Sequence, residues 1–533
     1  MQLRLNAQKL RKALRSVDEE DQDAGLEIRT WFGLNNTIKN TTTLTIDFDT
    51  IPRKFGELLA VALIDECELN PNQQLKLAGY VAKETKFLTF DDKYFATAKE
   101  LYNFLKPLKS SKSAANVAVL LGSRRYPAHA QVTYHTHEDY SFVSLRVSFN
   151  VGQYPYVETF VMGGSFLSVP VGELSQEEKE DPICLADWMR SKKIVELTPQ
   201  ILEEATGKLE KMERLKPRIQ MVCTGQCLEV ARSFWGASLQ ESKFGSFLHP
   251  ERVIFDTEFE QDDNDDDYYG RKELHYPFTP LVRIFSLRMK KYVLVDVGDL
   301  DDYVFDKTAI NRLVLPEKTR SLLTNIFNHK EETFGDVIAG KHGGMVIMAS
   351  GTTGVGKTLT AEVLAEYTER PLYVMELGEL GTQLASVENC LNNIFKRVTR
   401  WNALLLFDEA DIFLHKRDDN LERSAIVGVF LRLLDYFPGI MFLTTNRGEI
   451  IDPAILSRVT IKLDYPDLDD TARDRIWHVM FKLVGQTIET TGTLPKLKIN
   501  GRQIRNLMRL GVSMYGKQVT AEQIESLSEF TAK

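Results

Sequence analysis

The feature that most constrains this 533-residue chain is a glycine-rich octapeptide, residues 351–358, with the spacing G-x-x-x-x-G-K-T. Its glycines let backbone N–H groups curl around anionic oxygens, its lysine can reach terminal phosphates, and its threonine hydroxyl can bind Mg²⁺. An apolar run at 345–349 predicts a buried strand before it, and residues 359–367 favour a helix after it. The sequence therefore predicts a phosphate-binding loop formed by Gly351, Thr352, Thr353, Gly354, Val355, Gly356, Lys357 and Thr358.

Length and charge limit the class of protein. A chain of 533 residues is too long for one core and should form about three or four domains. The formal net charge of −9 argues against a surface devoted to nucleic acid or anionic membranes. Five scattered cysteines favour a reducing compartment, and we find no signal peptide and no apolar run of membrane-spanning length. We expect a soluble cytoplasmic protein.

Changes in periodicity indicate the domain organisation. The apolar spacing in residues 55–65 and 94–105 is typical of amphipathic helices, whereas residues 143–151 alternate as a half-buried strand does. The expected fold is a C-terminal α/β module, a parallel sheet flanked by helices plus a small helical lid, preceded by α+β domains. The predicted parts are a mostly helical domain (1–115), a β-containing domain (116–275) with an acidic loop (256–267), a strand-rich connector (276–318), a large α/β subdomain (319–466) and the lid (467–533).

Three stretches superficially resemble metal sites. His135 to Asp139 contains an H-x-H-x-D pattern, Cys223 and Cys227 are close in sequence, and residues 262–273 imitate the start of a calcium loop. The first two lack the further ligands that a metal site needs, and the third lacks the glycine that allows the sharp turn at the sixth position of a calcium loop. We favour a polar turn, structural cysteines and a solvated loop.

Acidic and amide side chains follow two further apolar runs. Residues 403–407 predict a buried strand that ends in Asp408 and Glu409, and residues 439–443 predict a third strand that leads to Asn446. Asp408 would meet Mg²⁺, and Glu409 would polarise an attacking water as general base. Asn446 can hold that water or a γ-phosphate from the opposite side.

This order of motifs, completed by a Ser-Arg pair at 457–458 and a helical lid that opens on Gly-Arg, resembles the AAA ATPase family. The chain is most similar to a group of fungal AAA proteins with a large uncharacterised N-terminal region, over about residues 281–514. The shared stretches are Gly-Lys-Thr-Leu-Thr-Ala-Glu (356–362), Arg-Pro-Leu-Tyr (370–373), Leu-Gly-Thr (380–382), Asp-Glu-Ala-Asp (408–411) and Asn-Gly-Arg-Gln-Ile (500–504).

The resemblance implies cofactors and roles. ATP and Mg²⁺ would be the cofactors, with Thr358 and Asp408 as the metal-binding side chains. Asn446 would be sensor 1, Arg502 sensor 2 and Arg458 the arginine finger. Leu359 would follow the phosphate loop in the nucleotide site, and the adenine would lie near residues 334–338, which include Val337 and Ile338.

The function expected from this reading is ATP hydrolysis by a ring of subunits, a hexamer, that remodels a macromolecular partner bound by the N-terminal region. A protein partner is favoured over nucleic acid. Residues 384–388 lack the aromatic residue of threading unfoldases, so remodelling by domain motion is at least as well supported. Two alternatives stay open: a nucleotide-gated scaffold or switch with slow turnover, and a nucleic-acid motor or loader, which the acidic balance disfavours.

Overall fold

The computed structural model divides the chain into two compact units, Met1–Asp302 and Tyr303–Lys533. The structure describes residues 2–32, 34, 38–67, 69, 73, 77, 80, 94–95, 98–106, 115–136, 141–151, 154–162, 183–215, 219–233, 236–241, 246–256, 279–328, 344–375, 379, 384–414, 421–446, 451–488 and 491–530.

The first unit begins with a small helical layer on a two-stranded ladder. Alternate residues of the first strand, Leu3 and Leu5, are buried against the helices, and the Asn6 side chain accepts a hydrogen bond from Lys9 N (2.9 Å) to cap the first helix. The elements are β1 (Gln2–Asn6), α1 (Ala7–Glu20), α2 (Gln22–Trp31), β2 (Thr43–Asp47) and α3 (Arg53–Glu66), with β1 antiparallel to β2.

A five-stranded antiparallel sheet follows, in the order β7-β6-β5-β4-β9. Val143, Leu145 and Val147 are buried in β6, which confirms the strand predicted from their alternation. The sheet contains β4 (Val117–Leu121), β5 (Arg124–Thr136), β6 (Ser141–Val151), β7 (Tyr154–Met162) and β9 (Ile194–Val195). The associated elements are β3 (Tyr94–Phe95), α5 (Ala98–Leu105), β8 (Ile183–Cys184), α6 (Leu185–Ser191) and α7 (Pro199–Leu215).

A seven-stranded antiparallel sheet completes the unit, in the order β12-β11-β15-β14-β13-β10-β16. β14 pairs with β13, and β15 pairs with β11, so residues 281–296 belong to this sheet and form no separate connector. Local periodicity predicts strands but cannot predict which distant strands pair. The strands are β10 (Gln220–Gly225), β11 (Cys227–Ser233), β12 (Gly236–Glu241), β13 (Phe247–Phe255), β14 (Leu281–Ser286), β15 (Lys291–Asp296) and β16 (Leu300–Asp302), with the short helix η2 (Val297–Asp299) before β16.

A polar network joins the five-stranded and the seven-stranded antiparallel sheets of the first unit. The Asp296 carboxylate accepts hydrogen bonds from the Tyr126 hydroxyl (2.9 Å) and Lys208 Nζ (3.1 Å), while Arg124 donates two hydrogen bonds to Asp299 (2.8 and 2.6 Å). Burial, reinforced by the Asp296 charge, raises the pKa of Tyr126. Because each buried charge has partners, the network fixes β5 against the end of β15.

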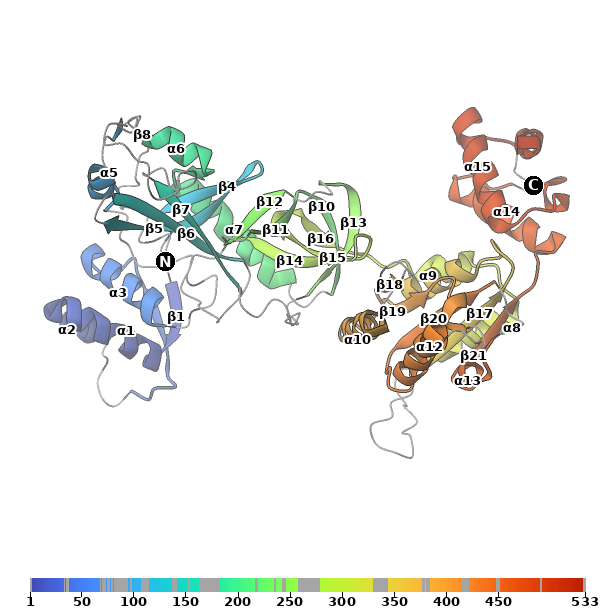
Figure 1. Ribbon diagram of the computed structural model, residues 1–533, viewed down its shortest axis with the longest axis horizontal. Helices are drawn as coiled ribbons and strands as arrows, with labels where there is room; N and C mark the ends of the chain where they lie inside the picture. Colours follow the sequence, from blue (N-terminus) through green and yellow to red (C-terminus); the bar gives the residue numbers. More distant parts are fainter. Residues whose placement is uncertain are drawn as a thin grey trace. The chain divides into compact units, whose positions relative to one another are not determined.

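The second unit is built on a five-stranded parallel sheet, which confirms the predicted α/β module. Its order is β18-β19-β20-β17-β21, and Figure 1 shows helices α9, α10, α12 and α13 around it. The strands are β17 (Met345–Gly351), β18 (Leu372–Met375), β19 (Leu404–Phe407), β20 (Ile440–Thr445) and β21 (Ile461–Tyr465). The helices are α8 (Glu317–Asn328), α9 (Lys357–Tyr367), α10 (Leu384–Arg400), α11 (Asp411–Leu414), α12 (Leu421–Leu434) and α13 (Pro453–Leu456).

This unit begins earlier than the predicted large subdomain does. Leu313 and Leu315 are buried in the same core as Ile347 of the central strand. Just after the unit boundary, the Tyr303 hydroxyl and Asp306 N both donate to the Glu366 carboxylate of α9. Residues 303–315, which include η3 (Lys307–Arg312), are therefore attached to the core of this unit and to α9, the helix that follows the glycine-rich loop.

A helical lid ends the chain. Trp477, Phe481, Ile504 and Leu507 form its buried centre. Asn500 and Gln503 form a capping box at the start of α15. The lid contains α14 (Asp470–Leu483), η5 (Leu494–Lys496), α15 (Gly501–Tyr515), α16 (Ala521–Ser526) and η6 (Leu527–Phe530). None of the helices that the structure describes is both long and apolar enough to cross a bilayer.

The strand pairing near the unit boundary predicts where the chain can be truncated without loss of folding. A protein that starts at Tyr303 keeps every described strand of the second unit, so we expect it to fold. A protein that starts at Tyr276 keeps β14 and β15 without β13 and β11, which exposes unpaired strand edges and apolar side chains such as Val282. It should aggregate in size-exclusion chromatography, and a monomeric 276–533 protein as heat-stable as 303–533 would contradict this expectation.

Candidate phosphate-binding site

The glycine-rich loop joins β17 to α9 and needs glycine at defined positions. Gly354 has a φ of +82°, and a Cβ there would lie 2.6 Å from Asn500 Cγ of the lid. Gly356 precedes α9 with a φ of +107°, a left-handed conformation that suits glycine. The loop therefore brings the N-terminus of an 11-residue helix, with its free N–H groups, to one edge of the sheet.

Lys357 lies in the floor of this loop. Its Nζ donates hydrogen bonds to Gly351 O (2.8 Å), Thr352 O (2.7 Å) and Asn446 Oδ1 (2.9 Å). Burial lowers the pKa of Lys357, although the Asp408 carboxylate acts in the opposite direction. All three ammonium hydrogens are used within the chain, so a phosphate oxygen must replace one of these acceptors.

The ends of β19 and β20 place the acidic pair beside the loop. Thr358 Oγ1 donates to Asp408 Oδ1 (2.9 Å), and Thr444 Oγ1 donates to the same oxygen (2.6 Å). A carboxylate and a hydroxyl are oxygen ligands of the kind that Mg²⁺ binds beside phosphates. The donor set of Thr358 and Asp408 therefore fits this ion.

Glu409 has an exposed side chain and a strained backbone. Its φ of +55° is left-handed, which costs a non-glycine residue about 1–3 kcal/mol. Its N–H donates to Thr444 Oγ1 (2.9 Å), and the next N–H, of Ala410, donates to Thr444 O (2.8 Å). Sequence reasoning missed Thr444, although a hydroxyl residue at the end of an apolar strand beside Asn446 is a signal that was available.

The two candidate arginines lie in different surroundings. Arg458 donates through Nε and Nη2 to Asp435 (2.7 and 2.9 Å) and through Nη1 to Ala454 O (2.9 Å), rather than to the phosphate loop. The Asp435 hydrogen bonds raise the pKa of Arg458. Arg502 is exposed in the first turn of α15, and its positive charge helps to lower the pKa of Lys357.

The lid touches the loop directly. Gly501 N donates to Gly354 O (2.9 Å), and Thr352 Oγ1 donates to Asp467 Oδ1 (2.6 Å). These contacts hold the start of α15 against the phosphate loop. Leu359 is exposed in the first turn of α9, while Val337 and Ile338 lie outside the described residues.

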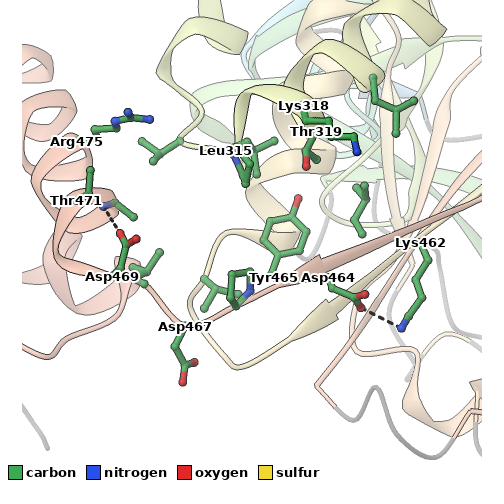
Figure 2. Close-up of a pocket in the computed structure, with 18 residues that line it drawn as sticks. Leu315, Lys318, Thr319, Lys462, Asp464, Tyr465, Asp467, Asp469, Thr471 and Arg475 are labelled. Atoms are coloured by element: carbon green, nitrogen blue, oxygen red, sulfur yellow. Dashed lines mark hydrogen bonds and ion pairs between the residues drawn. The ribbon is translucent and has the colours of Figure 1, made fainter.

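A pocket of about 720 Å³ adjoins the loop at Val355. Residues from α8, the end of β21 and the start of the lid surround it, including Leu315 and Arg475 in Figure 2. Leu468 adds a further apolar side chain to the lining. The Tyr465 hydroxyl is hydrogen-bonded to Thr360 Oγ1 (2.7 Å). Burial raises the pKa of Tyr465 to about 12. The pocket is large enough for a planar base or a ribose.

The parallel sheet, the glycine-rich loop and the acidic strand end together form a candidate phosphate-binding domain of the α/β class. Residues 347–467, from β17 to the start of the lid, match the family described as "ATPase family associated with various cellular activities (AAA)". Proteins with this domain generally hydrolyse ATP with Mg²⁺ and generally form ring oligomers. A search of curated proteins finds no match to the chain.

Proposed function

We propose that this protein is a Mg²⁺-dependent ATPase that assembles into a hexameric ring and remodels a protein partner. The observation that carries the proposal is the meeting of Lys357, Thr358, Asp408 and Asn446 at one edge of the parallel sheet, with Glu409 next to them. A cation for phosphate, ligands for Mg²⁺ and a carboxylate base are the parts that phosphoryl transfer to water requires.

Each side chain has a role in this proposal. The loop N–H groups and Lys357 bind the terminal phosphates, and Thr358 and Asp408 hold Mg²⁺, which neutralises developing phosphate charge when bound. Glu409 accepts a proton from the attacking water, and Asn446 orients that water or the γ-phosphate. Arg502, on the lid, would meet the phosphates when the nucleotide is present.

The base of the nucleotide is assigned to the pocket beside Val355. Its apolar lining suits an aromatic ring, and its position next to the phosphate loop suits a nucleoside attached to those phosphates. We propose that Val337 and Ile338 add further contacts to the adenine. The fungal-type likeness of residues 281–514 supports the same assignment of ATP.

The first unit is proposed to select the partner, because every candidate for phosphate contact lies in the second unit. The net charge of −9 favours a protein over a nucleic acid. ATP turnover that rises with a bound protein supports remodelling, whereas slow turnover with ATP-dependent assembly would support a scaffold or switch. Stimulation by DNA or RNA that is lost at high salt would support a nucleic-acid motor.

Removal of the Lys357 ammonium tests nucleotide binding. Lys357→Ala is expected to weaken MgATP binding by at least about 100-fold, because charged hydrogen bonds contribute about 1.5–3 kcal/mol each and the lysine forms more than one. Calorimetric titration measures the affinity. Lys482→Ala, an exposed lysine in the last turn of α14, is the matched control and should bind as the parent does. Unchanged affinity in a folded Lys357→Ala protein would refute the proposed site.

A further inference from the structure

Thr444 lies at the junction between the sheet and the acidic pair. In the parallel register, Leu443 of β20 lies beside Phe407 of β19. The residues that follow them, Thr444 and Asp408, therefore lie next to each other at the same end of the two strands. The Thr444 side chain is 1% exposed. Its position therefore follows from the pairing of two strands that are separated by more than 30 residues in the sequence.

One atom of Thr444 contacts both acidic residues. Thr444 Oγ1 donates its only hydrogen to Asp408 Oδ1 (2.6 Å), and it accepts the N–H of Glu409 (2.9 Å). The Thr444 carbonyl also accepts the N–H of Ala410 (2.8 Å). The hydroxyl thus sets the direction of the Asp408 carboxylate and holds the turn in which Glu409 has its left-handed φ of +55°.

We infer that Thr444 is a positioning residue for hydrolysis, acting through Asp408 and Glu409 at once. The inference rests on the proposed function, in which Asp408 holds Mg²⁺ and Glu409 accepts a proton. Partners that orient such groups change activity or metal affinity by about 10–100-fold when they are removed. A purely structural hydroxyl would instead change stability without a selective effect on turnover.

Valine tests the hydroxyl because it keeps the branched shape of threonine. Thr444→Val should lower kcat by about 10–100-fold while KM for ATP changes by less than about twofold. Thr444→Ser, which keeps the oxygen, should restore most of kcat. Thr491→Val is the control: Thr491 is 2% exposed and also donates to a carboxylate, Asp474, but lies in the lid away from the acidic pair.

Amide hydrogen exchange tests the role of Thr444 without a measurement of ATP hydrolysis. In nucleotide-free protein, Thr444→Val should speed amide exchange in a peptide that spans Phe407 to Asp411, because the Glu409 N–H loses its acceptor. Thr491→Val should leave that peptide unchanged. Melting temperatures of both valine variants show whether any loss of turnover is selective or follows general destabilisation.

A double variant separates this inference from the proposed function. If Thr444 acts through the acidic pair, adding Thr444→Val to the Glu409→Gln protein should lower kcat by a far smaller factor than Thr444→Val lowers kcat of the parent protein. Parent-like kcat or parent-like exchange in Thr444→Val, with Glu409→Gln inactive, would overturn the role of Thr444 alone. An active Glu409→Gln protein would overturn the assigned base, and with it this inference.

Discussion

Replacing Glu409 with glutamine is expected to leave MgATP binding intact and to lower the rate of ATP hydrolysis by about 10²–10⁴-fold. Glutamine keeps the size and shape of the side chain but cannot accept a proton from the attacking water. The backbone should be unaffected, because the Glu409 N–H hydrogen bond to Thr444 involves no side-chain atom of residue 409. Phosphate release measures the rate, and calorimetric titration measures binding.

The control for this variant is Glu522→Gln, which makes the same change of charge at an exposed position in the lid. It should hydrolyse ATP as the parent does. Because Glu409→Gln should bind ATP without consuming it, it should also retain the partner better than the parent in a pull-down. Turnover near the parent rate in Glu409→Gln would mean that another group is the base.

Arg458→Ala is expected to lower hydrolysis by about 10³–10⁵-fold, if the arginine acts on the nucleotide of a neighbouring subunit. That loss corresponds to about 4–7 kcal/mol in the activation free energy. Arg458 is bonded to Asp435 within its own chain, and its side chain is 31% exposed. The pair is only about one-third exposed, and an ion pair that solvent can reach contributes about 0–1 kcal/mol, so the loss of Asp435 as a partner is smaller than the gain at a developing phosphate charge.

Mixed assemblies test whether this arginine acts between subunits. Arg458→Ala and Lys357→Ala proteins, each inactive alone, should regain some activity when mixed, because some interfaces pair an intact arginine with an intact phosphate loop. Specific activity of the parent should rise with protein concentration as rings form. Asp435→Asn, which weakens the partner of Arg458, should retain most of the turnover.

The opposite results would identify a structural arginine. If Arg458 only pairs with Asp435, Arg458→Ala should keep full turnover, and mixing should restore nothing. Activity per subunit that is independent of concentration in a protein shown to be monomeric would also exclude action between subunits.

The parts of the site that depend on the local order of residues were predictable from the amino-acid sequence. A strand, a glycine loop and a helix follow one another along the chain, and this connectivity alone brings Lys357 and Thr358 to the end of β17. Apolar runs that end in Asp408 and Asn446 give central strands of a parallel sheet, because such strands are buried on both faces and carry their polar residues at the end. Carboxyl ends of parallel strands share one edge, so the meeting of these side chains was predictable.

The pairing of segments that are distant in the sequence became known from the folded structure alone. Residues 281–296 read as strands in isolation, but their place in the seven-stranded sheet depends on ladders with β11 and β13. The hydrogen bonds from Arg458 to Asp435 and the two hydrogen bonds of the Thr444 hydroxyl arise in the same way, since no periodicity of one segment specifies the polar atoms of another. Local sequence fixes which groups a strand end or loop carries, whereas the packing of the whole sheet fixes the partners that those groups meet.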